Sequence, residues 1–319
     1  MPTSTDVRIA VIVPCFNEAV AIDKVVKDFR KALPQATIHV YDNNSSDATI
    51  EVAKAAGAIV KTEPLQGKGH VVRRMFADVD ADIYILVDGD DTYDASIAPS
   101  LVEELQKNQL DMVNAARLSS SKESYRTGHR FGNWMLTSMV SWIFGQRFND
   151  MLSGYRVFSR RYVKSFPANA KGFEIETELT VHALQLHLPV IEVLTPYKER
   201  PEGSTSKLRT YRDGFHILVM IVRLLKSERP LLFFTSFAVL FAITGIALAT
   251  PIVETYLSTG LVPRLPTAMS IIGLAILSAI SFTCGVILDS VTQGRREMRR
   301  LAYLQHPAPC AEKIDPRRY

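Results

Sequence analysis

The sequence centres on one stretch, residues 83–92, which read IYILVDGDDT. Its apolar half predicts a buried strand, and its polar half places Asp88 and Asp90 at the end of that strand with one glycine between them. Such paired carboxylates suit a divalent cation, because Mg²⁺ and Mn²⁺ take hard oxygen ligands. A cation there would bridge a diphosphate and neutralise the charge that grows as the diphosphate leaves. The alternative, carboxylates that cap the next helix, describes Asp94 and Asp91 better than Asp88.

Short β-branched runs alternate with helical patterns on both sides of this stretch. The expected strands are residues 8–13, 37–41, 58–61, 83–87, 112–116, 155–158 and 190–194. The expected helices are residues 19–32, 47–56, 68–79, 96–107 and 176–187. This alternation predicts an α/β fold with a mainly parallel, helix-covered sheet, in which the last two strands are mixed in direction.

The residues that follow the expected strands are unusually polar. The first strand runs into residues 14–18, PCFNE, and the second into residues 42–47, DNNSSD. Ligands of open α/β sheets bind beyond the carboxyl ends of the strands, so we expect the functional site at this edge. The fingerprints G-x-G-x-x-G, G-x-x-x-x-G-K-[ST] and G-x-S-x-G do not follow these strands, which argues against dinucleotide enzymes, phosphate-loop enzymes and α/β-hydrolases.

Two uncharged apolar runs follow the α/β part, at residues 231–250 and 267–288. Each has about the length, roughly 20 residues, that a helix needs to cross a bilayer, so we expect two transmembrane helices in place of buried core helices. Basic residues flank the pair of apolar runs, whereas the segment between them, 251–266, contains only one basic residue, Arg264. The positive-inside bias predicts a multi-pass protein of the inner (cytoplasmic) membrane, with both termini and the catalytic domain in the cytoplasm.

The composition agrees with a membrane protein of a reducing compartment. The cysteines, Cys15, Cys284 and Cys310, lie far apart and show neither a disulfide framework nor a metal-ligand spacing. The net charge of +4 is mild, and the basic residues gather near the apolar runs, which suits anionic lipid and not nucleic acid. We expect no signal peptide before Val7, because the first apolar run is short and ends at Pro14. The oligomeric state stays open, with a homo-oligomer as one alternative.

We expect four segments along the 319 residues. They are a catalytic domain (1–208), a juxtamembrane amphipathic helix (209–229), a two-helix transmembrane hairpin (230–290) and a basic cytoplasmic tail (291–319). Another amphipathic stretch lies inside the first segment, where Met135, Met139 and Trp142 share a helical face. Both amphipathic stretches fit helices that lie in a membrane interface. For the stretch around Trp142, the alternative is packing onto the core of the domain.

Six short motifs span nearly the whole α/β part. They are Val13-Pro14-x-Phe16-Asn17-Glu18, Asp42-Asn43-x-Ser45-x-Asp47, Gly67-Lys68-Gly69, Asp88-x-Asp90, Asp150-x-x-Ser153-Gly154-Tyr155-Arg156 and Arg200-x-x-Gly203-x-x-Ser206-Lys207. In this order, and followed by two apolar helices, they resemble the family-2 glycosyltransferases, specifically the dolichyl-phosphate mannose and polyprenyl-phosphate glucose synthase group. The resemblance implies a GT-A fold, a Rossmann-like nucleotide-diphospho-sugar transferase domain.

The resemblance also implies how the donor, a UDP- or GDP-sugar, is bound. Nucleotide-binding residues are expected at Pro14, Asn17, Glu18, Asp42, Asn44, Lys68, Asp88 and Gly89. In this set, Asp42 would recognise the base and Lys68 would approach the ribose or diphosphate. Asp88 and Asp90 would hold the metal cofactor, Mg²⁺ or Mn²⁺. Thr92 stands where mannose synthases often have a further metal ligand, so the coordination set stays open.

The acceptor of this group is a polyisoprenyl phosphate, and its phosphate requires cations. Two phosphate-bearing substrates repel each other strongly once water is excluded, and arginine can bind phosphate through two parallel hydrogen bonds. Acceptor-phosphate residues are expected at Arg117, Arg126, Arg130, Ser153, Arg156, Arg200, Ser206 and Lys207. The glycine and serines around Arg200 and Lys207 suit a loop that closes over phosphates, whereas the other arginines taken singly could equally be solvated surface residues.

The expected catalytic groups are Asp150, Asp88, Arg117, Arg200 and Lys207. A lipid phosphate is largely ionised at neutral pH, so no strong general base is required. Asp150 is expected nearest the attacking oxygen, or else it orients a sugar hydroxyl or an arginine. Glu176 and Glu178 are alternatives for sugar contact, unless they only favour the N-terminus of their helix.

The expected reaction is a single in-line displacement with inversion, driven by positioning and charge stabilisation. Two other functions compete with it. A processive polysaccharide synthase is disfavoured, because the chain has two apolar runs and no Q-x-x-R-W motif. A non-catalytic nucleotide-sugar-binding scaffold is disfavoured by the intact D-x-D. The sugar, the base of the donor and the length of the lipid stay open.

Overall fold

The computed structural model describes residues 7–118, 138–145, 148–172, 174–198, 219, 222–262 and 264–309, and every structural statement below concerns these residues. The chain divides into two compact units, which are described separately. One consists of Met1–Phe215 with Met298–Tyr319, and the other of His216–Glu297.

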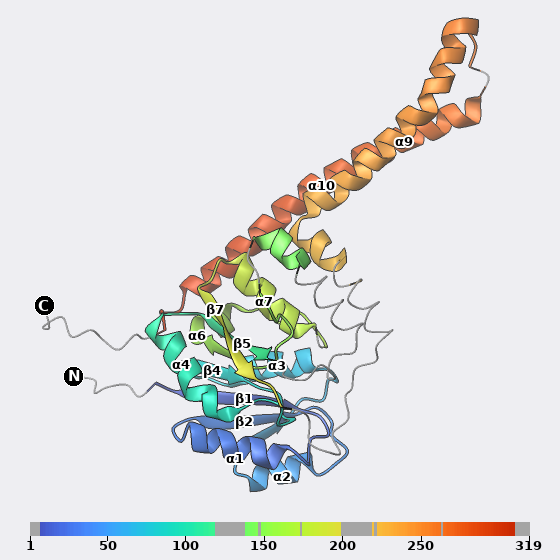
Figure 1. Ribbon diagram of the computed structural model, residues 1–319. Helices are drawn as coiled ribbons and strands as arrows, with labels where there is room; N and C mark the ends of the chain where they lie inside the picture. Colours follow the sequence, from blue (N-terminus) through green and yellow to red (C-terminus); the bar gives the residue numbers. More distant parts are fainter. Residues whose placement is uncertain are drawn as a thin grey trace, which may run out of the picture. The chain divides into compact units, whose positions relative to one another are not determined.

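The first unit is built on a seven-stranded sheet with the order β3-β2-β1-β4-β6-β5-β7 (Figure 1). The strands are β1 (Ile9–Cys15), β2 (Thr37–Asp42), β3 (Ile59–Thr62), β4 (Ile83–Leu86), β5 (Met112–Leu118), β6 (Arg156–Ser159) and β7 (Val190–Pro196). β6 is antiparallel to its neighbours β4 and β5, and the other neighbouring strands are parallel. The seven expected strands are confirmed, including the mixed direction.

Helices cover both faces of this sheet. They are α1 (Ile22–Ala32), α2 (Thr49–Ala55), α3 (Lys68–Asp78), the short 3₁₀ helix η1 (Ala95–Ile97), α4 (Ala98–Lys107), α6 (Arg160–Ser165) and α7 (Ile175–Gln185). Aliphatic side chains of α1, α2 and α4, such as Val26, Ala53 and Leu101, share one core cluster with the sheet. On the other face, α3, α6 and α7 contribute to an aromatic cluster that includes Phe76 and Tyr162. Strands buried on both faces are apolar throughout, as the sequence of β1 and β4 shows.

The second unit contains α9 (Pro230–Thr259) and most of α10 (Leu265–Leu304). Protein covers only 11% and 6% of their most apolar windows, so length and composition suit membrane spans better than core helices. Both helices are longer than expected. α9 continues through Pro251, because a long apolar helix tolerates the loss of the one backbone hydrogen bond that a proline removes. It ends at Thr259, with Gly260 as its C-cap. α10 continues past residue 290, so basic residues expected in a tail are helical up to Leu304.

The two amphipathic stretches are described only in part. Residues 138–144 are helical, with Val140 and Ile143 buried and Trp142 63% exposed. One face of this helix is therefore covered by protein, and the other leaves one large apolar side chain exposed. Residues 222–228 are also helical. The other residues of both stretches lie outside the described part of the chain, and their place in a membrane interface remains a prediction.

Candidate active site

The polar residues that follow β1, β2 and β4 meet at one edge of the sheet. Cys15 of β1 lies opposite Asp42 of β2, and Ile12 lies opposite Leu86 of β4. The strands run in parallel, so their carboxyl ends share that edge. The D-x-D and the two polar segments of the sequence are thus brought together as expected.

Asp88 belongs to a cluster of three charged side chains from three separate elements. The Lys68 ammonium donates to Asp88 Oδ1 at 2.5 Å and to Glu176 Oε1 at 2.5 Å. Lys68 is the first residue of α3, and Glu176 lies in the first turn of α7. Glu178 instead accepts from the backbone amides of residues 169 and 170. Of the two acids considered for sugar contact, only Glu176 therefore joins this cluster.

Burial and neighbouring charges shift the pKa values of Lys68 and Glu176 in opposite directions. Burial alone would lower the pKa of Lys68, but the carboxylates of Asp88 and Glu176 outweigh it and raise that pKa above its usual value. Burial raises the pKa of Glu176, and Lys68 offsets this only in part. Asp88 is the most exposed member, at 29% of its side chain. Lys68 is therefore a lasting positive charge beside a carboxylate that solvent and ligands can reach.

Two glycines bring Lys68 to this cluster. A Cβ on Gly67 would lie 2.2 Å from the backbone oxygen of Lys171, and one on Gly69 would lie 2.2 Å from that of Ala170. Gly67 also has a φ of +130°, a conformation that side chains disfavour. The Gly67-Lys68-Gly69 motif is thus explained by the close approach of α3 to the segment that precedes α7.

Asp90, the second carboxylate of the D-x-D, is only 4% exposed. Its Oδ1 accepts from Thr92 Oγ1 at 2.6 Å and from the Thr92 amide at 3.3 Å, so Thr92 orients Asp90. Among the described residues, no three His, Cys, Asp or Glu side chains gather as a metal site. Metal binding therefore remains a prediction that rests on Asp88 and Asp90. Two carboxylates suit Mg²⁺ or Mn²⁺, because such ions take one or two carboxylates and complete their shell with phosphate oxygens and water.

Asp42, at the end of β2, is fully buried. Its Oδ2 accepts from the Ser45 amide at 3.0 Å, whereas its Oδ1 has no partner in the described part of the chain. A buried carboxylate oxygen without a donor is unfavourable, so Oδ1 is suited to accept an N–H from a ligand. Uracil and guanine both carry such an N–H. Base recognition by Asp42 remains a prediction.

Asn17 shapes the loop after β1, between Pro14 and Glu18. It has a φ of +54°, which asparagine adopts more readily than most residues. Its Oδ1 accepts from the Ser46 amide at 2.8 Å, and its own amide donates to Ser45 Oγ at 2.8 Å. Asn17 therefore ties the first polar segment to the second, and nucleotide contact by Pro14, Asn17 and Glu18 remains a prediction.

Asn44 and Gly89 have clear roles within the protein. The Asn44 side-chain amide donates to the Pro64 carbonyl at 2.9 Å, which holds the loop before α3. Gly89 leaves room for the first strand, since a Cβ there would lie 2.6 Å from Cys15 Sγ. These contacts explain both residue types, and their expected contact with the nucleotide remains a prediction.

Arg117 and Asp150 form a second charged cluster. Arg117 Nε and Nη2 donate to the two oxygens of Asp150 at 2.6 and 2.9 Å. Burial would raise the pKa of Asp150, but the Arg117 guanidinium outweighs it and holds that pKa below its usual value. A carboxylate of such low basicity is a weak general base. Of the roles that the sequence left open for Asp150, orientation of an arginine is the one that this geometry supports.

Arg156 and Ser153 were expected at the acceptor phosphate, and the structure contradicts this. Both side chains are fully buried. Arg156 donates to the carbonyls of Met151 and Ser153 and to Thr180 Oγ1, while Ser153 Oγ donates to a backbone carbonyl of β5. Burial lowers the pKa of Arg156. Arg156 instead stabilises the loop that carries Asp150 by donating to its buried carbonyl groups, and Ser153 ties this loop to β5.

Glu192 of β7 is a site residue that the sequence did not point out. Its Oε1 accepts from Asn114 Nδ2 at 2.8 Å and from the Asp150 amide at 3.2 Å. Its Oε2 accepts from the Asn149 amide at 2.6 Å. Glu192 thus holds the start of the Asp150 loop. The available signal was a single acid within an otherwise apolar strand, V-I-E-V-L.

Five expected site residues lie outside the described part of the chain, so their positions remain predictions. They are Arg126, Arg130, Arg200, Ser206 and Lys207.

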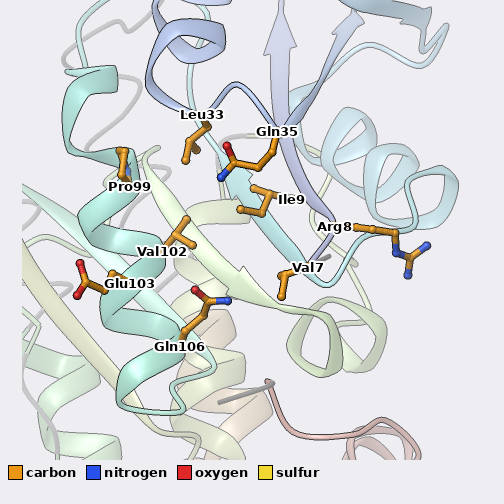
Figure 2. A pocket seen from close by; sticks show the side chains of 9 residues that line it. All are labelled: Val7, Arg8, Ile9, Leu33, Gln35, Pro99, Val102, Glu103 and Gln106. Carbon is orange, nitrogen blue, oxygen red and sulfur yellow. The ribbon is translucent and has the colours of Figure 1, made fainter. Parts of the chain in front are cut away.

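A pocket of about 510 Å³ is lined by none of the site residues that the structure describes (Figure 2). It is lined by residues 7–9 at the start of β1, by Leu33 and Gln35 before β2, and by side chains of α4. β1 runs from this pocket toward Cys15, so the pocket belongs to the amino ends of the strands. It is not the candidate active site, which lies beyond their carboxyl ends.

Comparison with known proteins identifies the family of this chain. The chain matches the family profile described as "Glycosyl transferase family 2" over residues 10–166. Protein RfbJ of Shigella flexneri is 60% identical over 124 residues, which are 39% of this chain and 96% of RfbJ. Glycosyltransferase AglJ of Haloferax volcanii is 32% identical over 308 residues, 96% of this chain and 100% of AglJ. A dolichyl-phosphate hexose transferase of Haloferax volcanii is 26% identical over 221 residues, 69% of this chain and 95% of that protein.

A solved structure shares the fold. Glucosyl-3-phosphoglycerate synthase of Mycobacterium tuberculosis, in complex with Mn²⁺, UDP-glucose and glycerol 3-phosphate, aligns with a TM-score of 0.57 at 21% identity. The alignment covers 70% of this chain and 80% of that one. At this level of identity the match concerns the fold alone, and the expected GT-A architecture is confirmed.

Proposed function

Because this chain belongs to glycosyl transferase family 2, we propose that it transfers a hexose-type sugar from a UDP- or GDP-sugar to a polyprenyl phosphate. The acceptor is undecaprenyl or dolichyl phosphate, reached from the cytoplasmic face of the inner membrane. The product is a polyprenyl-phosphate sugar for glycan or lipid modification. A relative named as a dolichyl-phosphate hexose transferase and the two long apolar helices support a lipid acceptor.

The observation that carries this proposal is the pair of charged clusters in one α/β unit. In the first, Lys68 joins Asp88 and Glu176, and in the second Arg117 is held by Asp150. A transferase that joins a nucleoside-diphosphate sugar to a phosphate must hold two anionic substrates together, and each cluster offers one of them a cation. A protein that only bound a nucleotide sugar would need the first cluster alone.

The donor would lie at the first cluster. Asp42 Oδ1 accepts an N–H of the base, and Lys68 lies where it can compensate the diphosphate charge. Asp88 and Asp90 would hold Mg²⁺ or Mn²⁺, and such an ion would supply positive charge for the leaving nucleoside diphosphate. Glu176 and Asp88 are the carboxylates available to the sugar hydroxyls.

The acceptor phosphate would lie at Arg117. One oxygen of the acceptor phosphate attacks the anomeric carbon from the side opposite the diphosphate. The bond from that carbon to the diphosphate breaks, and the configuration at the carbon inverts. The attacking oxygen carries no proton at neutral pH, so the reaction needs no strong base. This agrees with the lowered pKa of Asp150, whose role is to orient Arg117.

The membrane segments would bring the lipid phosphate to this site. α9 and α10 form the hairpin, and the helices at 138–144 and 222–228 lie in the interface. The exposed Trp142 suits this position, because tryptophan is enriched at headgroup depth.

A donor panel tests this proposal. The full chain, purified in detergent, is incubated with undecaprenyl or dolichyl phosphate and radiolabelled UDP- and GDP-hexoses, and the lipid product is identified by mass. We expect one sugar per lipid phosphate, loss of transfer with a chelator, and recovery with added Mg²⁺ or Mn²⁺. Products with many sugars per lipid would indicate a processive synthase, and nucleotide binding without any product would indicate a scaffold.

Gly154 offers a second test, because it packs directly on Asp88. A Cβ on Gly154 would lie 2.2 Å from Asp88 Oδ2. Gly154→Ala is therefore expected to displace that carboxylate and to lower transfer by about 10-fold or more, since small misplacements of reacting groups strongly slow a reaction. Gly273→Ala is the matched control, because a Cβ there meets no atom within 4 Å. Equal activity of the two variants would contradict a role for Asp88 in the site.

A further inference from the structure

Tyr197 contacts the segment that follows the D-x-D. It comes directly after β7 and forms an antiparallel bridge with Tyr93. The Lys198 amide donates to the Thr92 carbonyl at 2.9 Å in the same pairing. The rings of Tyr93 and Tyr197 meet edge to face, with centroids 5.3 Å apart. Backbone and side chain thus hold Tyr197 beside the D-x-D.

Tyr93 extends this contact to Asp88. Its hydroxyl accepts from the Gly154 amide at 2.9 Å, and Gly154 packs against the Asp88 carboxylate. The Tyr93 ring also meets Tyr155 edge to face at 5.4 Å. Tyr93 is buried and held on several sides, so it can transmit position from one residue to the next.

Tyr197 also contacts the second charged cluster. The guanidinium carbon of Arg117 lies over its ring, 5.4 Å from the centroid. Asp150 binds the edge of the same guanidinium at 2.6 and 2.9 Å. A planar group held at its edge by a carboxylate and at its face by a ring has a defined orientation.

We propose that Tyr197 is a positioning residue for the acceptor: its ring fixes the plane of the Arg117 guanidinium and, through Tyr93, sets that plane relative to Asp88. This inference rests on the proposed function, because it takes Arg117 to bind the acceptor phosphate. The nucleophile and the donor must approach along one line, so the orientation of Arg117 matters as well as its charge. None of these contacts uses the Tyr197 hydroxyl, so the ring alone is required.

The test separates the two substrates. For the full chain in detergent, the KM for undecaprenyl phosphate and the KM for the nucleotide sugar are measured in the parent, Tyr197→Phe and Tyr197→Leu. Loss of the ring removes a cation–π contact, so Tyr197→Leu should raise the KM for undecaprenyl phosphate about 10-fold. The KM for the nucleotide sugar should stay within about twofold, because Tyr93 keeps its own contacts with Gly154 and Tyr155 when the Tyr197 ring is lost. Tyr197→Phe should restore the parent value, and Tyr256→Leu, on α9, is the matched control.

Three outcomes would overturn the inference. One is a rise of both KM values together with a lower unfolding temperature, which indicates general damage to the fold. Another is a phenylalanine variant as impaired as the leucine variant, which would assign the role to the hydroxyl. A third is an unchanged Tyr197→Leu in a parent that makes the lipid-linked sugar, which would refute this inference and leave the proposed function intact. A parent that makes no such product with any donor would refute the proposed function first.

Discussion

Asp90→Asn is expected to lower the rate of sugar transfer by about 10²–10³-fold, as the loss of one preorganised charge does in other enzymes. Asparagine keeps an oxygen that can accept from Thr92 Oγ1, which lies 2.6 Å from Asp90 Oδ1. The substitution therefore removes the negative charge that would hold a divalent cation and leaves the local structure in place. Transfer is measured with radiolabelled donor at saturating Mg²⁺ and Mn²⁺, and folding by circular dichroism and the unfolding temperature.

The matched control is Asp91→Asn, the same chemical change one residue later. Asp91 pairs with the largely exposed Lys24 at 2.7 Å, and surface ion pairs of this kind contribute at most about 1 kcal/mol. Asp91 also has a φ of +56°, which asparagine adopts readily. We expect this control to keep its activity within about twofold of the parent, because Asp91 pairs with Lys24, which lies outside the candidate site. Full activity of Asp90→Asn, or an equal loss in both variants, would exclude a metal role for Asp90.

The sheet was predictable because its central strands have only one favourable environment. Every residue of β4 is buried, and β1 is buried apart from Pro14. Such continuous apolar runs, bounded by polar residues and glycine, fit a strand covered on both faces and little else. The polar segments after these strands then had to meet at one edge. The position of the D-x-D in the fold followed from this pattern alone.

The roles of the arginines were harder to predict, because a guanidinium can donate to phosphate and to backbone carbonyl oxygens alike. Arg117 and Arg156 both lie near Asp150 in the fold, yet only Arg117 binds its carboxylate. Arg156 belongs to β6, a strand between two others, so its side chain lies in the interior where carbonyl groups of a tight loop require donors. A motif shows which residue types occur together, but not which of them face the substrate.

Residues that support the site through contacts distant in sequence could hardly be recognised from the sequence around them. Glu192 binds the Asn149 amide across 43 residues, and Tyr93 pairs with Tyr197 across the sheet edge. Such contacts depend on the strand order, which hydrophobic periodicity does not encode. The ends of α9 and α10 were missed for a related reason. Hydropathy marks the part of a helix that suits a bilayer, and the helix itself continues until a residue such as Gly260 ends it.

Lys68→Met is expected to destabilise the protein by about 3 kcal/mol at neutral pH, the usual effect of removing one member of a buried ion pair. Lys68 is only 10% exposed and donates to both Asp88 and Glu176. Without the ammonium, two carboxylates remain close together with no common partner. Methionine fills a similar volume, so the effect comes from charge and not from a cavity. The measurement is urea unfolding of the full chain in detergent.

The destabilisation should grow with pH. Burial already raises the pKa of Glu176 in the folded state, and Lys68 works against that rise. Without Lys68, the folded-state pKa of Glu176 rises further above its value in the unfolded chain. Between these two pKa values the folded protein binds more protons than the unfolded chain, so its stability falls as pH increases. Below both pKa values Glu176 is protonated in the folded and in the unfolded state, so the free energy of unfolding of the variant approaches that of the parent.

Two further variants decide whether charge is the cause. Lys68→Met combined with Glu176→Gln should recover most of the lost stability and lose the added pH dependence, because one of the two unpaired carboxylates is gone. Lys61→Met is the matched control: Lys61 is largely exposed and pairs with Asp78 at 3.1 Å, so we expect a loss below about 1 kcal/mol. If Lys68→Met unfolds like the parent, or the double variant is no more stable than the single one, Lys68 is not the buried countercharge of this site.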